Sequence, residues 1–167
     1  MSSAVLGLGA NLGDAIAALQ GAVDALVSTA GITVNCSSAV FATEPVGGPQ
    51  QPTYVNAVVL IQTTLTPMQL LQRVNAIEEQ WHRTREVRWG PRTLDIDIIV
   101  FDSLVSSDPR LTLPHPRASE RGFVLVPWLD ADPDAELLGV PVRELVDQVD
   151  TSGVQLLDPP LELQVQS

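Results

Sequence analysis

Hydrophobic and polar positions alternate with a period of two along segments 53–63 and 94–101, and this pattern predicts two β-strands. In each segment one face is wholly apolar, whereas the other face is polar only at its start. Segments 4–9 and 32–41 have the composition of two further strands. The wholly apolar faces comprise Val55, Ala57, Val59 and Ile61 in the first segment and Leu94, Ile96, Ile98 and Val100 in the second.

Two other segments repeat their apolar residues at helical spacing, which predicts two α-helices. Asp14 can cap the first helix, whose end we place at Gly31. Thr66 followed by Pro67 begins the second helix, which we expect to end in an arginine-rich loop at 82–93. The apolar positions are Ile16, Leu19, Val23, Leu26 and Val27 in the first helix and Leu70, Leu71, Val74, Ile77 and Trp81 in the second.

These elements follow one another in the order β-α-β-β-α-β, which predicts an α+β fold of the ferredoxin-like type, an antiparallel sheet with two helices on one face. The apolar strand faces should lie under the helices. The residues at the polar start of each strand would then lie on the open face, namely Tyr54, Asn56, Asp95 and Asp97. After residue 102 we expect a proline-rich loop and short helices near 120–128 and 141–149.

The length of 167 residues, of which 45% are hydrophobic, predicts one domain, which we place at residues 1–150. We expect the acidic segment 151–167 to be poorly ordered or to add a peripheral extension. There is no signal-peptide pattern and no apolar run of the roughly 18 residues that a membrane span needs, so we expect a soluble, cytoplasmic protein. Cys36 is the only cysteine, which excludes an internal disulfide and favours a hard metal held by carboxylates over zinc.

Positive charge is concentrated in one part of an acidic chain. The net charge is −11 and there is no lysine, yet seven of the nine arginines fall between residues 83 and 121, a segment with net charge +1. Such a protein is unsuited to general nucleic-acid binding, which needs extended neutralisation of phosphates. A compact arginine cluster fits a small polyanion, because guanidinium groups bind phosphate oxygens in pairs. A set of solvated surface arginines is the alternative.

Asp95 and Asp97 form a candidate metal site. The strand period puts both side chains on one face, about 6 to 7 Å apart at the Cα atoms, where they could hold one or two Mg²⁺ ions. A half-exposed strand without function is the simpler explanation of the pair alone. Carboxylates for Mg²⁺ beside arginines for phosphate, however, are typical of phosphoryl transfer, where catalysis consists mainly of positioning and charge neutralisation.

Two further features bear on a ligand site. Tyr54, Asn56, Trp89 and Phe123 could clasp a flat heterocycle, with the aromatic rings stacking on its faces and the amide pairing with its polar edge. The segment GLGANLGD (7–14) runs from a strand into a helix, but it lacks the Gly-Lys-Ser/Thr ending of a phosphate-binding loop. We interpret it as a tight turn and helix cap.

Three segments carry a resemblance to a known family: EPVGGPQQPTYVNAVV (44–59), RWGPRTLDIDIIVFD (88–102) and LTLPHPRASERGFVLVPW (111–128). In order and separation they resemble the 6-hydroxymethyl-7,8-dihydropterin pyrophosphokinase (HPPK) family over roughly residues 4 to 150. The resemblance implies a ferredoxin-like fold. It also implies Mg²⁺-dependent transfer of diphosphate from ATP to 6-hydroxymethyl-7,8-dihydropterin, giving AMP and the pterin diphosphate, in folate biosynthesis.

The resemblance also implies roles for individual residues. Asp95 and Asp97 would be the ligands of two Mg²⁺ ions and, with Arg83 and Arg92, the catalytic residues. ATP would contact Asn75, Arg85, Arg92, Ile98, Arg110, Thr112, His115 and Arg121. The pterin would contact Thr43, Pro45, Val46, Tyr54, Asn56, Trp89 and Phe123. Partners would be these two small molecules alone, without nucleic acid or membrane, and we expect a monomer.

Two departures and two alternatives stay open at this point. The loop at 82–93 differs in length from some relatives by one residue, so the separate roles of Arg83 and Arg85 are not assigned, and segment 151–167 has no counterpart. A nucleotidyltransferase with a DxD motif would release inorganic pyrophosphate instead of AMP. A non-catalytic ferredoxin-like module would not bind Mg²⁺-ATP.

Overall fold

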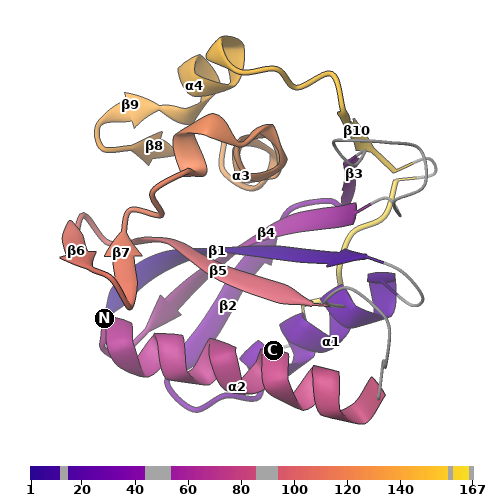
Figure 1. Cartoon of the computed structure of the whole chain (residues 1–167), viewed down its shortest axis with the longest axis vertical. Helices are drawn as coiled ribbons and strands as arrows, with labels where there is room; N and C mark the ends of the chain where they lie inside the picture. The colour runs from indigo at the N-terminus through magenta and orange to yellow at the C-terminus, as the bar shows by residue number, and fades with distance from the viewer. Residues whose placement is uncertain (12–14, 44–53, 86–93, 158–159, 166–167) are drawn as a thin grey trace.

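The computed structural model describes residues 1–11, 15–43, 54–85, 94–157 and 160–165. The first part runs through β1 (Ser2–Asn11), α1 (Ala15–Val27), β2 (Ile32–Ser37), β3 (Phe41–Thr43), β4 (Tyr54–Thr63), α2 (Pro67–Arg85) and β5 (Asp95–Phe101). The second part contains β6 (Ser106–Asp108), β7 (Leu111–Leu113), a 3-10 turn (Ala118–Glu120), α3 (Gly122–Ala131), β8 (Glu136–Leu137), β9 (Val140–Pro141), α4 (Val142–Gln148) and β10 (Val154–Leu156). Figure 1 shows α1 and α2 on one side of the main sheet and α3 and α4 on the other.

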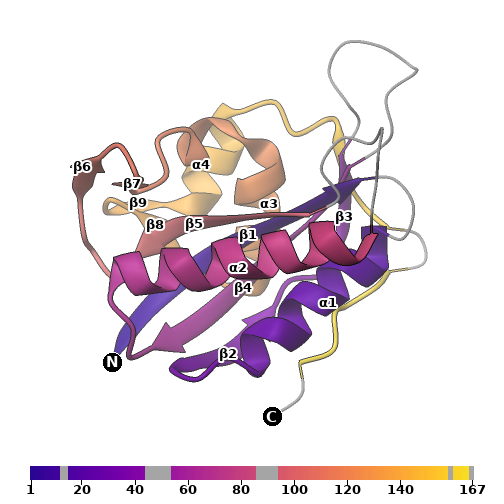
Figure 2. The ribbon, with the colours of Figure 1, turned by 60° about the horizontal axis from the view of Figure 1, so that its bottom comes forward.

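The main sheet is antiparallel, and β1 lies between β4 and the edge strand β5. The strand order is β10-β3-β4-β1-β5, and β2 also pairs with β4. The two connections β1-α1-β2 and β4-α2-β5 place both helices on the same face (Figure 2), so the predicted ferredoxin-like fold is confirmed. The strand predicted at 32–41 is instead split into β2 and β3. The split falls at Ser38, whose hydroxyl accepts the backbone N–H of Val58 at 2.9 Å.

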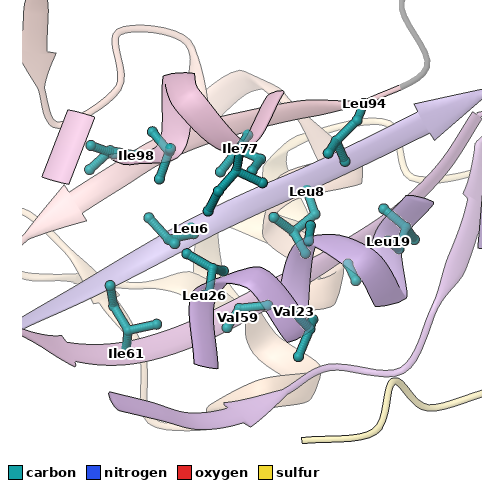
Figure 3. Packing of buried hydrophobic residues seen from close by; sticks show 14 of the residues in the cluster. Leu6, Leu8, Leu19, Val23, Leu26, Val59, Ile61, Ile77, Leu94 and Ile98 are labelled. Carbon is teal, nitrogen blue, oxygen red and sulfur yellow. The ribbon is translucent and has the colours of Figure 1, made fainter. Parts of the chain in front are cut away.

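Apolar side chains from β1, β4, β5 and the two helices form the main hydrophobic core (Figure 3). Leu6 and Leu8 of β1 pack in this core with Leu19 and Leu26 of α1, and all four are almost completely buried. Full burial of such a side chain stabilises the fold by about 1.5–3 kcal/mol relative to its exposure. The predicted apolar face of β4 is confirmed, because the same core contains Val55, Ala57, Val59 and Ile61.

The opposite face of the sheet is covered over its apolar half, where the sequence predicted an open face. Val58 of β4 and Ile99 of β5 lie in a second core with Leu125 and Trp128 of α3. Without α3 and α4 these apolar side chains would be exposed to water. Their burial therefore stabilises the packing of the two helices on this face of the sheet. The polar ends of β4 and β5 lie beyond this core.

A β-bulge in β5 changes which side its last residues face. The register with β1 shifts at Ile99, where one extra residue is inserted. As a result Phe101 lies in the main core, whereas Val100 packs against the second core. The faces predicted for the earlier residues of β5 are confirmed, but those predicted for Val100 and Phe101 are wrong, because a simple period of two allows no inserted residue.

The ends of the two large helices differ from the prediction. α1 ends at Val27, and Gly31, with φ of 89°, occupies the turn into β2. α2 continues to Arg85, so Arg83 and Arg85 belong to its last turn and not to a loop that begins at residue 82. Residues 82–85 contain no glycine or proline. Their intrinsic helix propensities therefore allow the helix to continue past the end that we predicted. Of the helices that the structure describes, none is long and apolar enough to cross a membrane.

The N-terminus of α2 is closed by a capping box. The Thr66 hydroxyl accepts the backbone N–H of Gln69 at 3.2 Å, and the Gln69 side-chain oxygen accepts the N–H of Thr66 at 2.9 Å. Thr66→Ala should therefore lower the free energy of unfolding by about 1 kcal/mol in urea denaturation. Thr64→Ala, at an exposed position just before the helix, is the control. Equal losses in the two variants would contradict the capping role.

The described residues of segment 151–167 lie along the edge of the main sheet. β10 pairs antiparallel with β3. Beyond it, Ala39 and Glu162 form an isolated antiparallel bridge, and Leu163 is buried in the main core. This part of the chain therefore extends the sheet past the edge strand of the predicted fold.

Candidate active site

A cavity of about 500 Å³ lies where the polar ends of β4 and β5 meet the N-terminus of α3. Strand β1 forms its floor. The lining residues are Gly7, Leu8, Gly9, Thr43, Tyr54, Asn56, Ala57, Asp95, Asp97, Arg117, Arg121, Phe123 and Val124.

Two glycines of β1 keep the floor of the cavity open. Gly9 lies between Asp95 on one neighbouring strand and Asn56 on the other, and Gly7 lies beside Asp97. A Cβ atom on Gly9 would be only 3.1 Å from Asn56 Oδ1. Both glycines are inside β1, in agreement with the strand predicted at 4–9. Residues 12–14, at the end of the predicted turn and helix cap in GLGANLGD, are outside the described residues. The glycines let a ligand approach the backbone between the two carboxylates and the amide.

Asp95 and Asp97 both line the cavity and are half-buried. Burial is the main cause that raises the pKa of Asp97, and the nearby Asp95 raises it further. His115 and Arg121 act in the opposite direction on the same carboxyl but do not outweigh burial. The site thus holds a carboxylate whose charge is insufficiently compensated in the protein alone, as expected where a cation is to bind.

His115 lies close to Asp97 in a fixed orientation. Its backbone N–H donates to the carbonyl of Ile99 at 2.8 Å, and its ring Nδ1 accepts the backbone N–H of Arg117 at 3.3 Å. An accepting Nδ1 leaves Nε2 to carry the hydrogen of the neutral ring. Burial lowers the pKa of His115, and Arg121 and Arg117 add to this, against the opposite effect of Asp97. The ring is therefore a neutral donor at neutral pH.

The raised pKa of Asp97 predicts a pH dependence of stability in the metal-free protein. Folding favours the protonated carboxyl, so the stabilising contribution is complete below the usual pKa of 3.8 and is lost as the pH rises through the folded value. Asp97→Asn cannot ionise. Its stability advantage over the unmodified chain should therefore grow with pH across that window and then level off, as measured by urea denaturation at a series of pH values. A difference that does not change with pH would contradict the raised pKa.

The remaining cavity side chains offer an amide, aromatic rings and guanidinium groups. Asn56 is buried, with 6% of its surface exposed, and its amide nitrogen donates to the Thr43 hydroxyl at 2.8 Å. The guanidinium carbon of Arg121 lies 5.4 Å from the centre of the Phe123 ring, a cation–π contact. Both pairs fix the direction of side chains that face the same cavity.

The cavity brings together part of the predicted site. Seven of the predicted residues line it, namely Thr43, Tyr54, Asn56, Asp95, Asp97, Arg121 and Phe123. His115 is joined to them through its interactions with Asp97 and Arg121. Outside the described residues lie Pro45, Val46, Trp89, Arg92 and the side chains of Arg83 and Arg85.

Four predicted residues lie away from the cavity lining. Asn75 is exposed on α2, and the side chain of Ile98 is buried in the main core. Arg110 is exposed in the β6–β7 turn, where it forms an ion pair with Asp108 at 2.9 Å. Thr112 on β7 donates its hydroxyl to the Asp108 carbonyl at 3.2 Å. Any ligand that reaches these residues must extend beyond the cavity.

Arg117, Gly7 and Gly9 line the cavity but were absent from the predicted site. Arg117 belongs to the arginine cluster between residues 83 and 121, so its position in the sequence could have indicated that it is a site residue. The glycines gave no such signal, because only the pairing of β1 with its two neighbours shows what lies beside them.

The donor set suits a hard divalent cation that is completed by a ligand. Among the described residues no group of three or more His, Cys, Asp or Glu side chains could hold a metal ion. Mg²⁺, however, is commonly bound by one or two carboxylates together with substrate phosphates and water. The two carboxylates of β5, with the raised pKa of Asp97, fit this kind of site.

The fold and the cavity together define a ferredoxin-like α+β protein whose sheet carries a carboxylate pair, an amide and arginines around one ligand-sized cavity. Residues 5–133 match the sequence profile of the family described as 7,8-dihydro-6-hydroxymethylpterin-pyrophosphokinase (HPPK). The chain belongs to this family.

Named relatives agree with this assignment. The chain is 45% identical over 158 residues to the 2-amino-4-hydroxy-6-hydroxymethyldihydropteridine pyrophosphokinase of Methylorubrum extorquens, an alignment that covers 95% of the chain and 100% of that protein. It is 41% identical over 162 residues to the protein of the same name from Synechocystis, with 96% and 83% covered.

A solved structure shares the fold. The wild-type HPPK-DHPS of Plasmodium falciparum, crystallised with pteroate, superposes on 88% of the chain with a TM-score of 0.71 and 14% sequence identity. The chain spans 44% of the length of that longer protein. At this identity the likeness shows the fold alone.

Proposed function

We propose that the chain transfers the diphosphate of ATP to the hydroxyl of 6-hydroxymethyl-7,8-dihydropterin, producing AMP and the pterin diphosphate, in folate biosynthesis. The observation that carries this proposal is the single cavity that joins the carboxylate pair of β5 to Asn56 and Phe123. Relatives that bear the name of this activity cover nearly the whole chain. A purely structural protein would have no need of Asp97, whose raised pKa reflects an unfavourable charge.

The amide and aromatic side chains suit the flat pterin ring. Asn56 is oriented by its bond to Thr43, so its carbonyl oxygen is held as an acceptor for the amino edge of the heterocycle. Phe123 and Tyr54 offer surfaces on which the ring can stack. These contacts bind and orient the acceptor, and burial of the ring removes water from its side of the cavity.

Cationic and donor groups near α3 suit the ATP phosphates. Arg117 and Arg121 line the cavity, and the neutral ring of His115 presents its Nε2 hydrogen as a donor. Arginines placed where negative charge accumulates are the usual means of stabilising a transferring phosphoryl group. We assign these groups to binding and orientation of the triphosphate.

The nucleoside would extend from the cavity along the outer edge of β5. The backbone N–H of Ile96 donates to the carboxylate of Glu78 on α2 at 2.8 Å, so it points away from β1. Ile98, two residues further, has the same parity, and its backbone N–H and C=O face the same outer side. An adenine base could therefore be recognised by backbone groups there while the Ile98 side chain stays in the core. Arg110 and Thr112 of the neighbouring hairpin remain proposed contacts of the nucleotide.

Asp95 and Asp97 would hold two Mg²⁺ ions between them and the phosphates. When bound, Mg²⁺ would neutralise the phosphate charge and lower the pKa of the attacking hydroxyl. The protein contributes the spacing of the two carboxylates on one strand face and the orientation of the ring against them. Water competes with the pterin hydroxyl as acceptor of the diphosphate. The walls of the cavity would exclude water and so limit hydrolysis of ATP.

The nucleotide product tests the proposal. Purified protein is incubated with ATP, MgCl₂ and 6-hydroxymethyl-7,8-dihydropterin, and the nucleotides are separated by ion-exchange chromatography. AMP formed in equal amount to the pterin diphosphate supports the proposal, whereas ADP alone contradicts it. Release of inorganic pyrophosphate would indicate a nucleotidyltransferase instead. The monomeric state, the cytoplasmic location and the restriction to small-molecule partners remain parts of the same proposal.

A further inference from the structure

The C-terminal residues contact two of the elements that line the cavity, β3 and the start of α3. β10 pairs with the outer side of β3, with Val154 opposite Thr43. The same region also approaches Gly122, the first residue of α3. The position that a Cβ atom would take on Gly122 lies 3.2 Å from the Asp150 carbonyl oxygen and 3.5 Å from Val154 Cγ2. One short segment therefore touches β3 and the start of α3 together.

Each of these contacts leads directly to a cavity residue. Thr43 accepts the hydrogen bond from the Asn56 amide at 2.8 Å, and Phe123 follows Gly122 in the chain. Thr43, Asn56 and Phe123 all line the cavity. The carboxylates, in contrast, lie on β5 at the far end of the strand order from β10. A displacement of β10 would therefore affect the ring-facing side before it affects the carboxylates.

The chain beyond β10 is anchored at several points. Leu161 accepts the backbone N–H of Val40 at 2.8 Å. Leu163 is buried in the main core with 6% of its surface exposed. Gln164 and Gln20 of α1 exchange two hydrogen bonds, each of 2.8 Å. These contacts hold β10 against β3 from the downstream side.

We propose that residues 154–157 and 160–165 form a C-terminal clamp that positions the ring-binding side of the cavity. The clamp would keep Thr43, and through it Asn56, in register with Phe123. This inference rests on the proposed function, since it concerns binding of the pterin ring. Coupling between two sites is reciprocal, so ring binding must in turn stabilise the clamp.

Hydrogen exchange in the unmodified chain tests this reciprocity. Exchange of the backbone amides of 154–157 should slow at least threefold when 6-hydroxymethylpterin is added to protein saturated with Mg²⁺ and a non-hydrolysable ATP analogue. The amides of the β8–β9 hairpin, which does not line the cavity, should change little. No slowing in the clamp, or equal slowing in the hairpin, would overturn the proposal.

A pair of core substitutions separates the clamp from general destabilisation. Leu163→Ala should raise the KM for the pterin at least fivefold, with the KM for ATP and kcat within twofold of the unmodified chain. Leu26→Ala removes an equally apolar side chain from the same core in α1 and should leave the pterin KM unchanged. Equal increases in both variants, or none in Leu163→Ala, would overturn the clamp.

Two other results have a defined meaning. If Leu163→Ala does not fold, the exchange experiment alone decides, because it uses the unmodified chain. If the unmodified chain releases no AMP, the proposed function fails, and the exchange response to the pterin still shows whether ring binding and β10 are linked.

Discussion

Asp97→Asn is expected to lower the rate of AMP release by roughly 10³-fold at saturating substrates while the chain stays folded. The substitution keeps the size of the side chain but removes one of the two charges that β5 presents to the cavity. Burial raises the pKa of Asp97, so a neutral amide is tolerated in the fold at least as well as the ionised carboxylate. Activity is measured by chromatography of AMP, and folding by circular dichroism.

Asp102→Asn is the matched control for this loss. Asp102 follows β5 directly, is exposed and accepts the backbone N–H of Ser3 at 2.8 Å, a bond that an asparagine oxygen can also accept. Its φ of 50° is a conformation that asparagine adopts readily. The control should therefore retain nearly full activity. If Asp97→Asn kept more than about a tenth of the activity, the role assigned to Asp97 by analogy with metal-assisted transfer would be wrong.

The part of the fold that was predicted correctly depends on local geometry. A period of two is a property of a single strand, so it placed Asp95 and Asp97 on one face and their apolar neighbours on the other without knowledge of the tertiary structure. The same holds for the start of α2, where Thr66 and Pro67 act within one helical turn. The order of these local elements then sufficed for the ferredoxin-like topology.

The features that were missed depend on residues distant in sequence. Val58 and Ile99 looked like ordinary strand residues, and only the packing of α3 shows that they belong to a second core. The bulge at Ile99 is a property of the pairing of two strands. The three residues of β10 are too few to show a period, and the strand forms on the template of β3.

In the candidate site, too, some features follow from the local sequence and others only from the tertiary structure. The sequence located the carboxylates, Asn56 and Phe123, which the fold places in one cavity. It placed Gly9 correctly at the end of a strand but gave no indication that this glycine lines the cavity. The importance of Gly9 follows from its position between Asn56 and Asp95, which requires the register of three strands. The roles of the individual site residues stay predictions.

Gly9→Val is expected to weaken binding of the pterin by roughly 10- to 100-fold without unfolding the chain. This range is the change in dissociation constant that corresponds to the usual free-energy cost of placing extra atoms in a filled site. Even the Cβ atom would come within 3.1 Å of Asn56 Oδ1, so the amide must move from its bond with Thr43. The two methyl groups of valine would also occupy the floor of the cavity, on which we propose that the ring lies. Valine is favoured in strands, so β1 itself should persist. The dissociation constant is measured by calorimetry with 6-hydroxymethylpterin and a non-hydrolysable ATP analogue.

Ser3→Val provides the comparison, because Ser3 is exposed and shares the face of Gly9 on the same strand, outside the cavity lining. It adds the same kind of side chain to β1 and should leave pterin binding unchanged. Gly9→Ala adds only the first atom, which requires Asn56 to yield by a few tenths of an ångström, so its effect should fall between those of the two valine variants. If Gly9→Val bound the pterin as tightly as the unmodified chain, the ring could not lie over β1 between Asn56 and Asp95. Stacking on Phe123 would then have to hold the ring at the wall of the cavity and away from its floor.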